Sequence, residues 1–195
     1  NLLKADEAER VFFQNASHEL RTPLMSISGY AQGIQRGVFE DVFQAAGVIL
    51  DESSRLTEVV DGILTLTRMD QMRYQVVPVE LGIREYIEDQ IERLEGLAYQ
   101  KKIKLEFLPG DEHKIISDVM LLGRAFSNVT SNCIRYAKET VQISVEAAGD
   151  RLKITIRDDG PGISEADLPH LFDRFYKGKN GNHGLGLSIA KRSME

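Results

Sequence analysis

The 195-residue sequence has little of what builds several common protein classes. It contains one cysteine, Cys133, so no disulfide can form within the chain, which is typical of a reducing compartment. It has 24 Lys and Arg against 30 Asp and Glu, and the formal net charge of -6 gives no electrostatic footprint for nucleic acid. No apolar run reaches the roughly 18–20 residues that span a bilayer. These scarcities leave a globular protein, and the 42% apolar content is ordinary for that class.

Two long segments of the N-terminal part have helical periodicity, with apolar or small residues at steps of three and four. The stripes are Phe13, Ala16, Leu20, Leu24, Ile27, Ala31 and Ile34, and, after the break "RGVFED", Ile49, Leu56, Val60, Ile63 and Thr67. This spacing predicts an antiparallel helical hairpin. A lone hairpin cannot bury both stripes, so we expect a homodimer in which two hairpins form a four-helix bundle.

From about residue 76 the pattern mixes the two periodicities, which predicts an α+β protein with domains at 1–75 and 76–195. Helical spacing recurs at 83–98, 121–133 and in "LGLSIAKRSM". Strict alternation of apolar residues predicts strands at 103–107, 141–145 and 152–156. We expect an α/β sandwich in which one helix layer covers a mixed sheet.

The stretch "FFQNASHELRTPL" places His18 away from the apolar stripe, where it should be exposed and substantially neutral at physiological pH. Pro23 has no N–H for the Glu19 carbonyl, so the helix should kink or loosen there. One interpretation is a solvated histidine beside a tolerated kink, or a helix start capped by Thr22. The other is a nucleophile with a neighbouring carboxylate as its base or orienter.

The stretch "FSNVTSNCIRYA" lines up Asn128 and Asn132 with Arg135 and Tyr136 beside an apolar helical face. Asparagine is a mediocre helix former, so two of them aligned with an arginine suggest a ligand. The amide oxygens could hold a hard cation and the guanidinium a phosphate. An ordinary solvated face is the alternative.

In "LKITIRDDGPGI" the strand alternation separates two aspartates. Asp158 continues the buried series and needs a hydrogen-bond donor, such as the exocyclic amine of a ligand, whereas Asp159 continues the outward series. Gly160 and Gly162 permit close backbone approach. A tight turn capped by an aspartate is the alternative.

The stretch "GNHGLGLSIAK" places Gly181, Gly184 and Gly186 before a helical segment, where backbone N–H groups can bind phosphate. The signal is weak by itself. It lacks the preceding strand of a dinucleotide-binding fold and the Lys-Ser/Thr pair of a P-loop.

In the order "FFQNASHELRTPL", "FSNVTSNCIRYA", "RDDGPGI", "LPHLFDRFYKG", "GNHGLGLSIAK", residues 10–192 resemble the successive boxes of a two-component sensor histidine kinase. The resemblance implies a dimerising phosphoacceptor hairpin followed by an ATP-binding domain of the gyrase and heat-shock type. The family normally continues with two further strands, so the C-terminal strands are expected to be missing, which would leave an unpaired sheet edge.

The resemblance implies a role for each box. His18 matches the phosphoacceptor, Glu19 its base or orienter, and Thr22 the polar residue that helps a water attack the phosphorylated response regulator. The nucleotide contacts it implies comprise Asn128, Asn132, Arg135 and Tyr136 in one box, Asp158, Gly160 and Gly162 in the next, Phe172 and Phe175 in the aromatic box, and Gly184, Leu185 and Gly186 in the last.

Within that nucleotide set, Asn132 matches the Mg²⁺ ligand, and Asn128 would be a further contact on the phosphate or metal side. Arg135 lies at the place of the basic residue near the phosphates, and Tyr136 at that of the aromatic residue near adenine. Asp158 matches the acceptor of the adenine amino group. The second glycine box departs from the family at Asn182, and the lid between Tyr176 and Gly181 is short.

The implied activity is autophosphorylation of His18 with Mg²⁺ and ATP, then transfer to an aspartate of a response regulator, with phosphatase activity as a second function. A non-catalytic dimeric scaffold that binds the regulator is the alternative. A third interpretation, in which ATP binding only changes the shape of the domain, leaves His18 unexplained. By the same resemblance the chain would be the cytoplasmic portion of a membrane-bound sensor.

Overall fold

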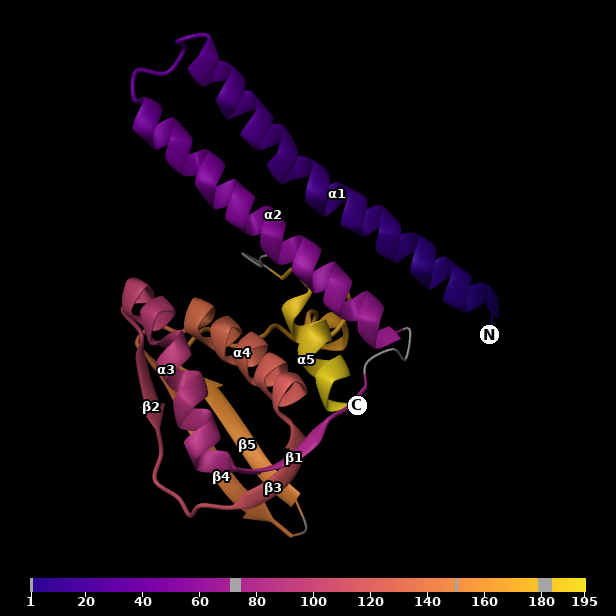
Figure 1. The fold of residues 1–195 in the computed structure, drawn as a ribbon, viewed down its shortest axis with the longest axis vertical. Helices are drawn as coiled ribbons and strands as arrows, with labels where there is room; N and C mark the ends of the chain where they lie inside the picture. The colour runs from indigo at the N-terminus through magenta and orange to yellow at the C-terminus, as the bar shows by residue number, and fades with distance from the viewer. Residues whose placement is uncertain (1, 71–74, 150, 179–183) are drawn as a thin grey trace. The chain divides into compact units, whose positions relative to one another are not determined.

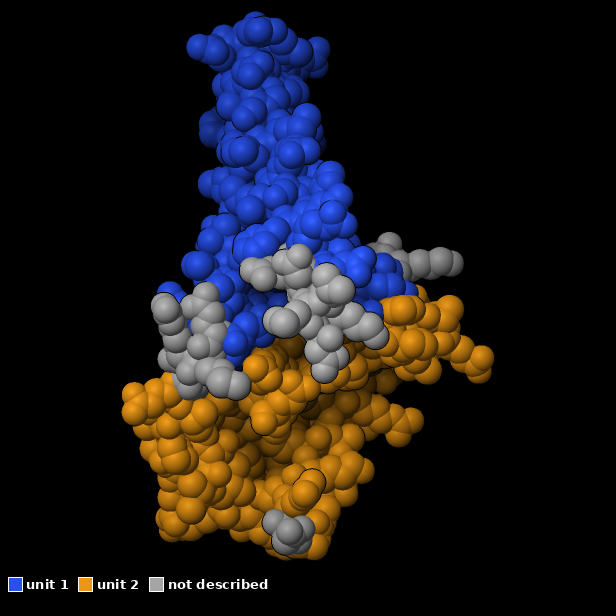
Figure 2. All heavy atoms as spheres, turned by 90° about the vertical axis from the view of Figure 1, so that its right-hand side faces the viewer, with its two compact units in different colours: residues 1–73, 173–185 blue, residues 74–172, 186–195 orange. Residues whose placement is uncertain are grey.

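The computed structural model describes residues 2–70, 75–149, 151–178 and 184–195. The chain divides into two compact units, one made of Asn1–Arg73 with Asp173–Leu185 and the other of Tyr74–Phe172 with Gly186–Glu195 (Figure 2). Each unit therefore combines segments that are distant in sequence. None of the described helices is both long enough and apolar enough to cross a membrane.

The first unit contains the predicted helical hairpin, formed by α1 (Leu2–Gln35) and α2 (Val42–Asp70), which run antiparallel (Figure 1). Asp41 caps α2, because its Oδ1 accepts the backbone N–H of Gln44 at 2.9 Å. At the same end the ring of Tyr30 stacks on that of Phe39, with centroids 5.3 Å apart. Phe39 lies so close to Gly33 that a Cβ there would be 2.9 Å from its Cζ. These contacts fix the connection between the helices.

The predicted stripes coincide only in part with the face that the two helices bury, since Ala16 is buried as predicted but several other stripe residues are not. In α1 Phe12 and Pro23 are buried, whereas the predicted Phe13 and Leu24 are 56% and 55% exposed. In α2 the buried residues are Ala45, Val59, Gly62, Leu66 and Met69. Phe13 and Leu24 are therefore left uncovered within one chain, which agrees with the expectation that a lone hairpin cannot bury both stripes. The apolar band on each helix is wider than one chain can cover, and its outer edge remains in solvent.

The second unit is the expected α/β sandwich with a mixed sheet. Strand β4 (Thr140–Ala148) lies between β2 (Lys104–Phe107), which is parallel to it, and β5 (Arg151–Asp158), which is antiparallel. The helices of this unit are α3 (Ile83–Lys101), α4 (Val119–Tyr136), α5 (Gly186–Met194) and the short η1 (Leu168–His170).

A second, two-stranded sheet was not predicted. It pairs β1 (Pro78–Gly82) antiparallel with β3 (Lys114–Asp118). Pro78 and Gly82 look like turn residues in the sequence, but proline is tolerated as the first residue of a strand. The pair leads the chain into α3 and α4, whose first residues directly follow Gly82 and Asp118.

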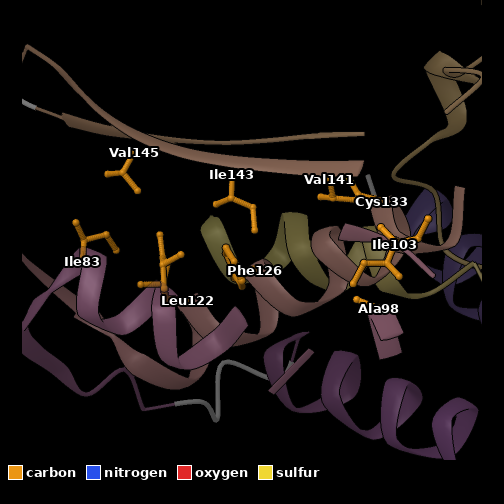
Figure 3. Close-up of a cluster of buried hydrophobic side chains, with 11 residues drawn as sticks. Ile83, Ala98, Ile103, Leu122, Phe126, Cys133, Val141, Ile143 and Val145 are labelled. Carbon is orange, nitrogen blue, oxygen red and sulfur yellow. The ribbon is translucent and has the colours of Figure 1, made fainter. Parts of the chain in front are cut away.

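The core of the second unit lies between the three-stranded sheet and the helices α3 and α4. Figure 3 shows Val145 and Ile143 of β4 directed toward Leu122 and Phe126 of α4, and Val141 beside Cys133. The alternation of exposed and buried residues along β4 puts these two valines and the isoleucine on one face. Of the predicted nucleotide residues, Asn132, Arg135 and Tyr136 lie in the last turns of α4, and Asp158 is the last residue of β5.

Candidate functional site

The histidine segment lies in a continuous helix. α1 runs from Leu2 to Gln35 through Pro23, so a helix start capped by Thr22 is excluded. His18 is exposed, as predicted, and the side chain of Pro23 is fully buried. The Thr22 hydroxyl donates to the His18 carbonyl at 3.3 Å, one turn back along the helix. His18 and Thr22 are therefore neighbours on the helix surface, four residues apart.

Glu19 has a partner that the sequence did not reveal. In the same compact unit, Lys177 Nζ lies 2.5 Å from Glu19 Oε2, with side chains 30% and 21% exposed. The contact joins residues 158 positions apart, so no local pattern could have predicted it. Lys177 lies in the stretch "RFYKG", but nothing in that stretch indicates which acidic residue the lysine pairs with.

The residues just before Lys177 contact the hairpin as well. Arg174 pairs with Asp70 through two contacts, at 2.8 Å and 2.9 Å. The ring of Phe175 packs on Phe12 with centroids 5.5 Å apart. Phe175 also has a φ of 64°, a left-handed backbone conformation that non-glycine residues adopt rarely. A nucleotide contact for Phe175 therefore stays a prediction, and its described contact is aromatic packing.

The last glycine box begins in this unit. The Phe175 N–H donates to the Gly184 carbonyl at 2.7 Å. Gly184 has a φ of 66°, and a Cβ there would lie 2.5 Å from the carbonyl carbon of Phe175, so the position requires glycine. Leu185 is buried. Gly181 and Asn182 lie outside the described residues.

The polar residues predicted on one face of α4 differ in how exposed they are. Asn132 and Tyr136 are half-buried and Arg135 is exposed. Asn128 uses its Nδ2 to bond the Arg124 carbonyl at 2.8 Å, and its Oδ1 lies 2.8 Å from where a Cβ of Gly186 would be. Asn128 thus connects α4 to the first residue of α5, and its predicted phosphate contact remains a prediction.

Asp158 lies at the end of β5 close to α4. It is half-buried, as the alternation predicted, and its Oδ1 accepts the Gly160 N–H at 2.9 Å. The thiol of Cys133 in α4 hydrogen bonds to Asp158, and burial, then the Asp158 carboxylate, raises the pKa of Cys133 to about 12. Gly160 in turn lies against the carbonyl oxygen of Tyr136, where a Cβ would not fit.

These contacts bring the ends of α4 and β5 together, so Asp158, Gly160 and Tyr136 share one region of the second unit. Because the Oδ1 of Asp158 accepts from the turn that follows it, the interpretation as a capped turn holds alongside the ligand hypothesis. Gly162 has a φ of 75° and open space around it. Phe172, in the aromatic box, is 46% exposed, with Lys191 Nζ 5.7 Å from its ring centroid.

Asp159 was expected to point outward and was given no role. It is exposed, but its carboxylate accepts backbone N–H groups from Lys138, Glu139 and Thr140. Partial desolvation raises the pKa of Asp159, and the backbone hydrogen bonds outweigh it, so the pKa lies below its ordinary value. Asp159 therefore keeps its charge, and its hydrogen bonds join the end of β5 to the connection between α4 and β4.

Two family models match separate parts of the chain. Residues 8–71 match the His Kinase A (phospho-acceptor) domain. Residues 117–195 match the histidine kinase-, DNA gyrase B-, and HSP90-like ATPase. The first range contains His18, and the second contains the four remaining boxes.

Among curated proteins, the chain is similar to the sensor histidine kinase CssS of Bacillus subtilis, with 36% identity over 99% of the chain and 43% of that protein. Among solved structures it is similar to the Acinetobacter baumannii histidine kinase AdeS, with 25% identity, a TM-score of 0.76, and coverage of 91% of this chain and 85% of that one.

The histidine kinase ThkA, solved in complex with response regulator protein TrrA, has the same fold. It is 18% identical, with a TM-score of 0.71, over 98% of this chain and 59% of that one. The chain spans less than half of the length of the curated relative CssS.

Proposed function

Since the chain belongs to the sensor histidine kinases of two-component systems, we propose that it phosphorylates itself on His18 with ATP and passes the phosphoryl group to a response regulator. The observation that carries this proposal is the exposed imidazole of His18 on α1, inside the match to the phospho-acceptor domain. An exposed neutral imidazole nitrogen is a competent nucleophile near neutral pH.

In the proposed reaction, His18 Nε2 attacks the γ-phosphorus of ATP. The new P–N bond forms as the bond between the γ-phosphorus and the bridging oxygen breaks, and ADP leaves with that electron pair. The imidazolium that develops gives its Nδ1 proton to Glu19. Because Lys177 takes the Oε2 of Glu19, we assign proton acceptance to the Oε1. The phosphorylated His18 then donates to an aspartate of the regulator.

The ATP-binding role is supported by the second unit. Gly160 and Gly186 both stand where a Cβ would collide with a neighbouring residue, so these glycines let the turn after β5 and the start of α5 pack closely against α4, which carries Asn128 and Tyr136. The Asp158 carboxylate would accept from the adenine amino group, with Tyr136 near the base and Arg135 near the phosphates. Gly186, in the same unit, would be a further nucleotide contact, and the roles of Phe175, Gly184 and Leu185 stay predictions from the resemblance.

Mg²⁺ is the second ligand that we propose. The described residues contain no cluster of three or more His, Cys, Asp or Glu that could hold a metal alone. The half-buried amide of Asn132, with Asn128 one turn away, suits a hard cation whose remaining ligands are phosphate oxygens and waters. When bound, the ion neutralises charge on the phosphate groups.

We also propose phosphatase activity toward the regulator. Thr22 lies one turn from His18 on the same helix surface, and its hydroxyl is within hydrogen-bond reach of the helix backbone. Such a hydroxyl can hold a water that attacks the phosphorylated aspartate. The solved complex of ThkA with TrrA supports a regulator as the partner class for this fold.

The wide apolar bands of α1 and α2 support a homodimer through the hairpin. Because the chain spans 43% of the length of CssS, we propose that it is the cytoplasmic portion of a longer, membrane-bound sensor.

The test is labelling with [γ-32P]ATP and Mg²⁺. We expect label that is acid-labile and base-stable, present in the wild type and absent in His18→Gln. His113→Gln is the matched control. His113 is half-buried just before β3 and is not among the residues proposed to react or to bind ATP, so labelling should stay intact. A wild type that binds nucleotide but takes no label would contradict the kinase proposal. A wild type that binds the regulator but no nucleotide would favour the scaffold.

A further inference from the structure

The side chain of Asp159 meets three successive backbone N–H groups. Its Oδ1 accepts from Lys138 at 2.8 Å and from Glu139 at 3.2 Å. Its Oδ2 accepts from Glu139 at 3.1 Å and from Thr140 at 3.2 Å. Consecutive N–H groups that converge on one point form an anion-binding concavity, and here the occupant is a side chain of the same chain.

The three amides belong to the last two residues of the short connection between α4 and β4 and to the first residue of β4. α4 ends at Tyr136 and β4 begins at Thr140. The backbone adds one more link, since the N–H of Asp159 donates to the Thr140 carbonyl at 3.3 Å. The connection is therefore fastened to the residue that directly follows β5.

The residues on both sides of Asp159 belong to the candidate nucleotide site. Asp158 precedes it, and Gly160 follows it with its N–H bonded to the Asp158 carboxylate. Gly160 also lies against the carbonyl oxygen of Tyr136, at the end of α4. A shift of the connection between α4 and β4 would therefore move Tyr136 and the helix that bears Asn132 relative to Asp158.

We propose that Asp159 is a positioning residue of the nucleotide site. Its carboxylate fastens the connection between α4 and β4 to the end of β5. This sets the spacing between Asp158, at the adenine side, and the α4 face that carries Asn132, at the metal side. The inference rests on the proposed nucleotide binding. It adds to the site a residue whose carboxylate, within the described part of the chain, bonds only to backbone N–H groups and not to the side chains proposed to bind the nucleotide.

The role requires a carboxylate. Three N–H groups need acceptor oxygens, and an ionised carboxylate has two oxygens that both accept. An asparagine in the same place would direct its own NH₂ donors at one or more of these N–H groups, so at least one donor would lose its partner. We therefore expect Asp159→Asn to loosen the connection although the side chain keeps its size.

Asp118 offers a matched control at the other end of the same helix. Its carboxylate also accepts three backbone N–H groups, from Met120 at 2.9 Å, Leu121 at 3.0 Å and Val77 at 2.8 Å. Asp118 precedes the first turn of α4, whereas the nucleotide residues lie in its later turns. Asp118→Asn should therefore lower thermal stability in the same way without moving the nucleotide site.

The experiment measures the dissociation constant of the full chain for ADP with Mg²⁺ by calorimetry, together with the thermal midpoint. We expect Asp159→Asn to weaken binding about tenfold, the order expected from losing one hydrogen bond to a charged group. Asp118→Asn should change it less than about twofold. At saturating ATP, the labelling rate of Asp159→Asn should approach that of the wild type, because the reacting groups are unchanged.

A rescue experiment separates positioning from general loss of stability. Asp159→Ala leaves the three N–H groups open, so formate should bind there and restore most of the ADP affinity, whereas chloride at equal ionic strength should not. Unchanged ADP affinity in Asp159→Asn, equal weakening in Asp118→Asn, or the absence of formate rescue would overturn the inference. A wild type that binds no ADP would instead reject the proposed nucleotide binding, and this inference with it.

Discussion

At the scale of single residues, Gly160 and Gly162 occupy the same turn but differ in their surroundings. A Cβ at Gly160 would collide with the Tyr136 carbonyl oxygen and lie 2.6 Å from Asp158 Oδ1. Gly162 has open space around it, and only its φ of 75° disfavours a side chain. The first glycine is needed for close packing, and the second for its backbone conformation.

We therefore predict different effects for two alanine variants. Gly160→Ala should push the turn away from α4 and so lower both the thermal midpoint and the affinity for ADP. Gly162→Ala should cost about 1 kcal/mol through its left-handed backbone and, because the space around it is open, weaken ADP binding less than Gly160→Ala does. Thermal denaturation and calorimetric titration of both variants would check this. Equal ADP affinities in the two variants would contradict the assignment of Gly160 to the site.

The sequence predicted the placement of some of these residues and not of others. The alternation along β5 put Asp158 on the buried side and Asp159 on the outer side, because side chains of a strand alternate strictly. The partners of Asp159 could not be predicted, since they are backbone N–H groups about 20 residues earlier. The pairing of Glu19 with Lys177 was equally invisible, because it depends on the tertiary fold.

At the scale of elements, α3 begins without a cap from its own N-terminal residue. Its N-cap position is Gly82, which offers no side-chain acceptor. Glu112 takes that role from a distance of 28 residues, accepting from the N–H groups of Arg84 at 3.0 Å and Glu85 at 3.3 Å. A carboxylate at a helix N-terminus also interacts favourably with the helix dipole.

We predict that Glu112→Gln lowers the thermal midpoint at neutral pH. The backbone hydrogen bond from Arg84 lowers the pKa of Glu112, and partial desolvation opposes it. A lowered pKa in the folded state means that the stabilisation is present above the unfolded pKa, about 4.3, and is lost as the pH falls through the folded value. The difference between wild type and variant should therefore shrink in acid.

Thermal scans of both proteins between pH 7 and pH 3 would measure this difference. Glu92→Gln is a suitable control, because Glu92 is an exposed glutamate on the same helix. Its difference from the wild type should be small at neutral pH. A gap between wild type and Glu112→Gln that stays constant down to pH 3 would show that the carboxylate charge is not what stabilises α3.

The elements themselves differed in how well they could be predicted. The long helices and the strands β4 and β5 have clear periodicity, so their existence followed from the sequence. The pair β1 and β3 was missed, because each strand has five residues, too few for a periodicity that separates it from a loop, and Pro78 and Gly82 at the ends of β1 look like turn residues. Their pairing across 36 residues depends on the tertiary fold.

At the scale of the whole molecule, the offset between predicted and buried faces has a physical meaning. The sequence identified the middle of a wide apolar band on each helix, whereas the hairpin buries only one edge of it. Val60 and Leu64 of α2 remain 39% and 46% exposed, although Val59 and Leu66 beside them are fully buried. Such a band that one chain leaves in water is the usual mark of a helical interface with a second chain.

If a second copy covers this band, a charge placed on it should dissociate the dimer. Val60→Glu and Leu64→Glu lie on the same side of α2, since they are four residues apart. Each would bury a carboxylate without a partner in the proposed interface, which is strongly unfavourable. Glu58→Lys is the control: it alters a charge two residues from Val60 and so on the opposite side of the helix.

Sedimentation equilibrium would measure the outcome for the wild type and the three variants. We expect a dimer for the wild type and for Glu58→Lys, and a monomer or a much weaker dimer for Val60→Glu and Leu64→Glu. The far-UV circular dichroism should remain helical in each, because both altered residues are already partly in water within one hairpin. A wild type that sediments as a monomer, or a Val60→Glu variant that stays dimeric, would mean that the apolar band is covered in some other way.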